Sequence, residues 1–281
     1  MLRIGVSGGC IQLTEDNLSK MSQAGITAVE LSSSPIYQAE ADYKLLKSTA
    51  EKFGVELWSC HLPFYPFEDF DISTLDVEAR KRIVNYQGEL IKKAADVGID
   101  KFVIHPSGEP IEDSLRSEHL ECAMDSLAAL AEIAFKAGGR VAVEDLPRSC
   151  LGRDINELCK LVSPDERLGV CFDMNHLLYD DNVEFIKTLG EKIITVHVSD
   201  YDFVDEKHWL PGEGKNDWNA IYNGLKEVGY NGVWMYELRL ESPKTILRER
   251  DLTFKDIYDN AQAVFKGEKI TPMGVPTGIK R

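Results

Sequence analysis

An apolar run near the middle of the chain ends in a carboxylate, and an imidazole follows about one helical turn later. The run GVCF (169–172) leads directly into Asp173, and His176 comes three residues after it. An aspartate in this place could cap a following helix. Aspartate and histidine are also side chains that commonly bind divalent metal ions, and here the two lie close together in the sequence. The ends of the other strand-like runs help to choose between these two interpretations.

Histidine or carboxylate side chains stand at, or just after, the ends of six consecutive strand-like runs. They are His61, His105, Glu144, Asp173 with His176, His197 and Glu237. Taken singly, each could be a surface histidine or an ion-paired structural acid. Burying a carboxylate beside the apolar residues that precede Glu144 and Glu237 is costly unless it is paired or bound to metal. Together the six positions predict a metal site, and imidazole with carboxylate suits Zn²⁺, Mn²⁺ or Fe²⁺ better than Mg²⁺.

The elements that must position these residues alternate along the whole chain. Strand-like runs span 3–7, 28–32, 56–61, 101–105, 140–144, 168–173, 193–198 and 232–238. Helix-like segments span 14–24, 39–53, 76–97, 114–137, 154–162, 183–189, 217–228 and 254–265. Eight such units predict an α/β fold of parallel strands, and more specifically a single (β/α)8 TIM barrel over 1–267 with an irregular tail over 268–281. An open doubly wound sheet is the alternative.

Composition and charge limit the classes of protein to which this chain can belong. The chain has 281 residues, a formal net charge of -15 and 43% hydrophobic residues. Because nucleic-acid binding depends on neutralising phosphates, this charge counts against a nucleic-acid partner. The six cysteines form no CxxC pair, the first residues do not resemble a signal peptide, and no apolar run approaches the roughly 18 residues of a membrane span. We therefore expect a cytoplasmic protein without a membrane partner, and we leave open a homo-oligomer.

Short motifs along nearly the whole chain resemble a known superfamily. The motifs HLPF, VIHPSG, VEDLP, FDMNH, VHVSD, HWLPGEGKNDW and YEL are similar to those of the xylose isomerase-like TIM barrels. That superfamily includes sugar phosphate isomerases and epimerases, ketose 3-epimerases, inosose dehydratases and class II AP endonucleases. Resemblance to the epimerase branch implies that one divalent ion is held by Glu144, Asp173, His197 and Glu237. It also implies that His176 contacts substrate, while His208 stands where an arginine is common.

Resemblance to the AP endonuclease branch implies a larger ligand set with three zinc ions. That set would comprise His61, His105, Glu144, Asp173, His176, His197, Glu206, His208 and Glu237, with Glu206 in place of an aspartate. The acidic stretch YDFVDEKH, where a DNA-facing loop should be basic, counts against this branch.

We therefore expect a divalent-metal-dependent isomerase or epimerase of a small sugar or sugar phosphate. Glu144 and Glu237 would transfer the proton through a metal-stabilised enediolate, with Mn²⁺ or Zn²⁺ as the metal and Fe²⁺ or Co²⁺ as alternatives. The histidines expected to contact the substrate are His61, His105, His176 and His208. An apolar wall is expected from Trp58, Phe64, Tyr65, Phe67 and Trp209, with 63–71 as the specificity loop. A zinc-dependent phosphodiesterase of the endonuclease IV type and a dehydratase of an inosose-like polyol are the alternative functions.

Overall fold

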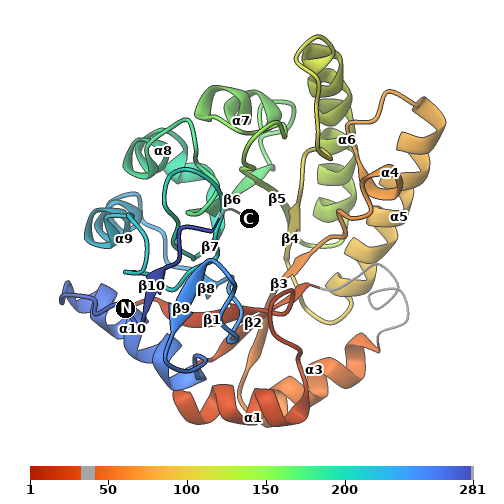
Figure 1. Cartoon of the computed structure of the whole chain (residues 1–281). Coiled ribbons are helices and arrows are strands. Elements are labelled where there is room, and N and C mark those ends of the chain that lie inside the picture. Colours follow the sequence, from red (N-terminus) through yellow and green to blue (C-terminus); the bar gives the residue numbers. More distant parts are fainter. Residues whose placement is uncertain (33–41, 280–281) are drawn as a thin grey trace.

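Eight parallel strands form the centre of the molecule, with helices around them (Figure 1). The computed structural model describes residues 1–32 and 42–279. The strands are β1 (Arg3–Ser7), β2 (Ala28–Ser32), β3 (Glu56–His61), β4 (Lys101–Ile104), β5 (Arg140–Glu144), β6 (Gly169–Asp173), β7 (Ile193–His197) and β8 (Val233–Tyr236). Each strand pairs with its neighbours in chain order, β1 also pairs with β8, and a bridge between Val198 and Tyr236 joins β7 to β8. The prediction of a single (β/α)8 TIM barrel is confirmed.

The helices follow the strands as the alternation predicted. They are α1 (Glu15–Ala24), α3 (Tyr43–Lys52), α4 (Phe67–Phe70), α5 (Val77–Ala95), α6 (Arg116–Lys136), α7 (Ile155–Leu161), α8 (Asn182–Leu189), the 3-10 turn η1 (Gly190–Lys192), α9 (Trp218–Glu227) and α10 (Phe254–Lys266). Of the helix expected over 39–53, residues 39–41 lie outside the described part. Asp42 caps α3 by accepting hydrogen bonds from the backbone N–H groups of Lys44 and Leu45. Side-chain caps of this kind set where most of the helices begin.

The core lies mainly between the strands and the surrounding helices. The apolar faces of the helices pack against residues that point outward from the barrel, such as Phe172 and Trp234, both fully buried. The barrel interior holds smaller clusters, one of them around Trp58 and Met235. Because both faces of the sheet are covered, the strands read as nearly continuous apolar runs. This packing holds the carboxyl ends of the strands rigidly around one mouth.

A small second sheet lies beside that mouth. β9 (Ile246–Arg248) pairs antiparallel with β10 (Gly274–Pro276), so the tail expected to be irregular contains one short strand. The hydrogen bond from Thr277 N to Thr245 O continues this contact. Within the described residues no helix is both long and apolar enough to cross a membrane.

Candidate active site

The carboxyl ends of strands β3 to β8 bring most of the predicted side chains to one pocket. The cavity has a volume of about 1050 Å³. Its lining includes His61, His105, Glu144, His176, Glu206, His208 and Glu237. Asp173 and His197 are fully buried and lie next to this lining, within reach of Glu144. The position of each residue follows from the barrel, because parallel strands present their carboxyl ends to the same mouth.

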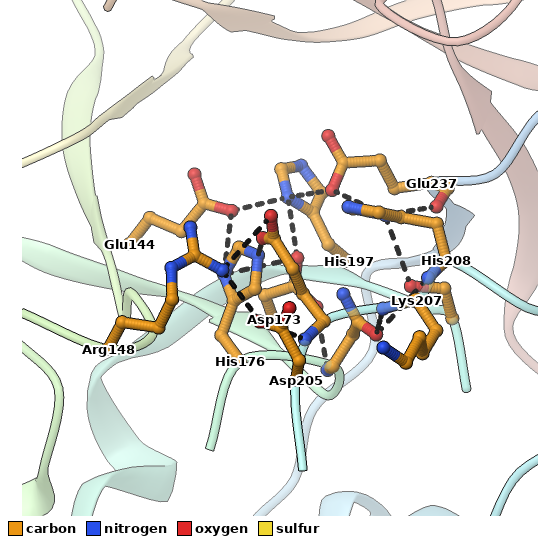
Figure 2. Close-up of polar contacts among 12 residues, drawn as sticks. Glu144, Arg148, Asp173, His176, His197, Asp205, Lys207, His208 and Glu237 are labelled. Atoms are coloured by element: carbon orange, nitrogen blue, oxygen red, sulfur yellow. Dashed lines mark hydrogen bonds and ion pairs between the residues drawn. The ribbon is translucent and has the colours of Figure 1, made fainter. Parts of the chain in front are cut away.

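Four of these residues form a compact group of ligand types. Glu144, Asp173, His197 and Glu237 each offer one ligand atom, and these atoms all lie within 4.8 Å of one another. His197 Nδ1 is 3.0 Å from Glu144 Oε1, 3.5 Å from Glu237 Oε2 and 3.9 Å from Asp173 Oδ2 (Figure 2).

The donor set of this group fits a divalent cation. Asp173 Oδ2 is buried and has no hydrogen-bond partner within the described residues. Three carboxylates converge on one imidazole nitrogen, and such a set is costly to bury without a compensating positive charge. These ligand types match those of Zn²⁺ and related transition metals.

Glu30 holds the far side of the His197 ring. His197 Nε2 lies 3.0 Å from Glu30 Oε1, and both side chains are fully buried. Ser7 Oγ and Ser59 Oγ also donate hydrogen bonds to Glu30. Because a carboxylate accepts hydrogen bonds, Glu30 favours a proton on His197 Nε2. A neutral ring then turns the lone pair of Nδ1 toward Glu144 Oε1 at 3.0 Å, so a proton or a metal ion must lie between these two atoms. Sequence reasoning missed Glu30, which lies inside a strand; its one signal was a charged residue within the apolar run AVELS.

Two further groups flank the first one. His61 and His105 each place Nε2 near Glu144 Oε2, at 3.1 Å and 3.2 Å. On the other side, His176 Nε2 is 3.1 Å from Glu206 Oε2, and His208 completes that group. All the sequence-predicted ligands within the described residues thus lie in three adjoining groups.

Three of these histidines share one hydrogen-bond pattern. Nδ1 of His61 donates to Leu62 O, Nδ1 of His176 to Asp145 O and Nδ1 of His208 to Glu237 O, at 2.9, 2.9 and 3.0 Å. Because a carbonyl oxygen only accepts, each Nδ1 carries a proton and a neutral ring turns an Nε2 lone pair outward. For His61 and His176 that lone pair meets a carboxylate oxygen, so a proton or a metal ion must lie between them.

The segment that carries Glu206 and His208 is firmly fixed. His208 has a φ of 52°, a left-handed conformation that is uncommon outside glycine. Asn175 Oδ1 accepts hydrogen bonds from the backbone N–H groups of Lys207 and His208, at 2.8 and 3.3 Å. Asp200 accepts from Gly212 N, Gly214 N and the Trp218 indole. These contacts outweigh the strain and hold His208 toward the pocket (Figure 2).

Arg148 links three loops at the rim through ion pairs. Its guanidinium lies 2.8 Å from Glu109, 2.8 Å from Asp205 and 3.3 Å from Glu206. Glu109 follows β4, Arg148 follows β5, and Asp205 and Glu206 follow β7. The cation is therefore neutralised by the protein itself, and it helps to hold Glu206 beside His176. Sequence reasoning did not place Arg148 in this role.

The local electrostatics keep the two candidate catalytic acids ionised. Burial alone would raise the pKa of Glu144, but the nearby His197 and His105 hold it well below its usual range. Burial is likewise outweighed at Glu237, where His197 and His208 lower the pKa to about 2. Burial lowers the pKa of His105 and of His208, although the charges of Glu144 and Glu237 oppose this effect. Other members of the set shift the opposite way: burial raises the pKa of Asp173, and nearby acidic groups outweigh burial and raise the pKa of His176 and of His197. Ionised carboxylates and neutral imidazoles are the states that bind metal, so a metal ion would have to displace the protons that these groups favour without it.

The predicted apolar wall is only partly present. Phe64, Tyr65 and Phe67 line the pocket. Trp58 instead lies in the barrel interior, where its indole donates to Thr195 Oγ1 at 3.2 Å. Trp209 is buried away from the pocket lining, and its indole donates to Thr245. The prediction was therefore wrong for the two tryptophans.

Comparisons with known proteins agree with the fold. The model of a family described as xylose isomerase-like TIM barrel matches residues 18–257. An uncharacterised protein of Methanocaldococcus jannaschii is 28% identical over 206 residues, 70% of this chain and 69% of the relative. An inosose isomerase of Bacillus velezensis is 25% identical over 195 residues, 63% of this chain and 69% of the relative. A solved D-tagatose 3-epimerase-like protein superposes with a TM-score of 0.79 at 24% identity, covering 94% of this chain and 96% of that one.

Proposed function

The chain belongs to the xylose isomerase-like TIM-barrel family, and we propose that it is a divalent-metal-dependent isomerase or epimerase of a sugar or sugar phosphate. The observation that carries the proposal is the convergence of Glu144, Asp173 and Glu237 on His197 Nδ1 at the pocket floor. Two relatives support the reaction class by their names, inosose isomerase and D-tagatose 3-epimerase-like protein.

Glu144, Asp173, His197 and Glu237 would hold the metal ion. We propose Mn²⁺ or Zn²⁺, with Fe²⁺ or Co²⁺ as alternatives, because mixed imidazole and carboxylate ligands suit these ions. A bound ion of this kind supplies a Lewis acid that polarises a carbonyl oxygen. Asp173 and His197, both fully buried, serve only to hold the ion.

Glu144 and Glu237 would move the proton. They come from β5 and from the end of β8, so they approach the substrate from different sides of the mouth. Both are ionised at neutral pH, so one can accept a proton from the carbon next to the carbonyl group. For epimerisation, the second carboxylate would first take up a proton from solvent and then donate it to the opposite face of the substrate carbon. For isomerisation, the first carboxylate would return the proton that it accepted to the neighbouring carbon. His61, His105, His176 and His208 would orient the substrate hydroxyl groups.

Replacing Glu144 with glutamine tests this assignment. We expect Glu144→Gln to reduce turnover by roughly 10²–10⁴-fold, because the amide cannot accept the proton. The measurement is exchange of the substrate C–H hydrogen with deuterated solvent, followed by NMR over a panel of ketoses. Glu132→Gln on α6 makes the same change far from the mouth and should keep full activity. Full activity in Glu144→Gln, with wild-type circular dichroism, would remove Glu144 from the mechanism.

A second candidate function is a zinc-dependent phosphodiesterase of the endonuclease IV type. It is favoured by the three adjoining ligand groups and by the shared orientation of the histidine rings. The net charge of -15 disfavours it, because a DNA substrate is a polyanion. We therefore rank it second.

A further inference from the structure

The pocket has two halves of different chemistry. Its floor consists of the histidines and carboxylates described above. Among the described residues, four separate segments give the rim apolar side chains: Phe64, Tyr65 and Phe67 after β3, Pro147 after β5, Pro243 after β8, and Ile279 in the tail. Arg148, Arg239 and Lys244 also lie in the lining. A ligand that fills both halves must itself be polar at one end and apolar at the other.

The aromatic side of the rim begins at the floor and extends outward. The Phe64 ring stacks on the ring of His105, with 4.0 Å between the centroids and 21° between the planes. Tyr65 meets Phe67 edge to face at 5.5 Å. Tyr65 is 64% exposed and Phe64 is 37% exposed, so both offer ring surface to a ligand. Aromatic surface of this kind gains most when an apolar group covers it.

The tail supplies another part of the rim. Thr277 binds the loop after β8 twice, through its N–H to Thr245 O at 3.0 Å and through its hydroxyl to Lys244 O at 2.9 Å. These bonds, with the pairing of β10 and β9, bring Ile279 into the pocket lining, where it is 55% exposed. The tail therefore belongs to the pocket.

We infer that the substrate is a sugar that carries an apolar substituent, with the sugar on the floor and the substituent against the rim. The inference rests on the proposed function. The cavity of about 1050 Å³ matches the upper end of pockets for drug-sized ligands, so a free monosaccharide leaves much of it unfilled. Arg148 is less suited to bind a phosphate group, because it is already paired with Glu109, Asp205 and Glu206. Arg239 and Lys244 also line the cavity, and the experiment tests them with a phosphorylated probe.

The test compares three forms of each ketose with the metal-loaded enzyme. Each sugar of a panel is supplied as the free ketose, as its terminal phosphate and as the benzyl ether of the same terminal hydroxyl, and kcat/KM is measured by NMR. For the sugar that turns over, we expect kcat/KM to be about tenfold higher for the ether than for the free form. Tyr65→Ala and Ile279→Ser should each reduce the ratio of kcat/KM for the ether to kcat/KM for the free sugar. Phe135→Ala, which removes a 59% exposed ring on α6, is the matched control and should change nothing.

The possible outcomes separate this inference from the proposed function. The inference is overturned if kcat/KM is equal for the ether and the free sugar. It is also overturned if the ether keeps its higher kcat/KM in both rim variants. Either result leaves the isomerase assignment unchanged. A preference for the phosphate also overturns it and assigns the rim to Arg239 and Lys244. No turnover of any form overturns the proposed function, and this inference with it.

Discussion

His197 is held from both sides of its ring, and Glu30 is the partner on the side away from the pocket. The two residues are 167 positions apart in the sequence and meet inside the barrel at 3.0 Å. An acid in this position fixes which ring nitrogen is protonated and makes the other nitrogen a better ligand.

Glu30→Gln should therefore weaken metal binding by roughly 10–100-fold. The amide can still accept a hydrogen bond but carries no charge to support the imidazole. The measurement is the metal dissociation constant from competition with a chelator, which does not depend on turnover. Glu213→Gln is the control, because Glu213 is a buried acid that pairs with Arg248 at 2.7 Å away from the ligand groups. If both variants bind metal as tightly as the wild type, Glu30 has no such role.

The sequence located most residues of the candidate site and missed others for a physical reason. The strand-end pattern pointed to Glu144, Asp173 and Glu237, which the structure places together, because strand ends of a parallel barrel share one mouth. Glu30 and Arg148 act through contacts across the barrel or between loops. Such contacts depend on the register of distant strands and on loop conformation, which no local pattern specifies.

At the scale of elements, long periodic segments were predictable and short ones were not. The eight strands and the long helices begin and end close to the predicted residues. The four residues of α4 and the three residues each of β9 and β10 were missed, since so short a segment shows no periodicity. These short elements form or support the pocket rim, so the rim was less predictable than the floor.

Helix α10 begins with a reciprocal cap that is sensitive to acid. Thr253 and Asp256 form a capping box, and Arg250 pairs with Asp256 at 2.7 Å. The hydrogen bonds from Arg250 lower the pKa of Asp256, although partial burial opposes them. A carboxyl group whose pKa is lowered by folding stabilises the fold above its unfolded pKa of about 3.9, and this contribution is lost as the pH falls toward the folded value.

Asp256→Asn should lower the melting temperature by about 2 °C near neutral pH, because a partly exposed cap and ion pair contribute about 1 kcal/mol. The difference from the wild type should shrink between about pH 5 and pH 3, where the wild-type carboxylate loses its advantage. Thermal unfolding followed by circular dichroism at several pH values measures both effects. Asp259→Asn on the same helix, in an exposed pair with Lys255, should cost less. If the difference in melting temperature between Asp256→Asn and the wild type stays constant down to acid pH, the Asp256 carboxylate does not stabilise the helix in this way.

At the scale of the whole molecule, the net charge and the number of potential metal ligands favour different functions. The net charge of -15 favours a small substrate over a nucleic acid. The three adjoining ligand groups could hold more than one metal ion. Two of the groups share Glu144, and His176 of the third group lies 3.8 Å from Glu144 Oε1. Geometry alone therefore allows either one occupied site or several.

The number of metal ions bound per chain decides between the two functions. For the isomerase or epimerase we expect about one Mn²⁺, Fe²⁺ or Zn²⁺ per chain by plasma mass spectrometry of protein purified without added metal. Glu206→Gln should leave this number unchanged, because Glu206 lies outside the group around His197. A count of about two to three zinc ions, with one lost in Glu206→Gln, would mean that the flanking histidines are ligands. Hydrolysis of phosphodiesters, including DNA with abasic sites, would then become the first reaction to assay, because several zinc ions around one pocket can activate water and neutralise a phosphate.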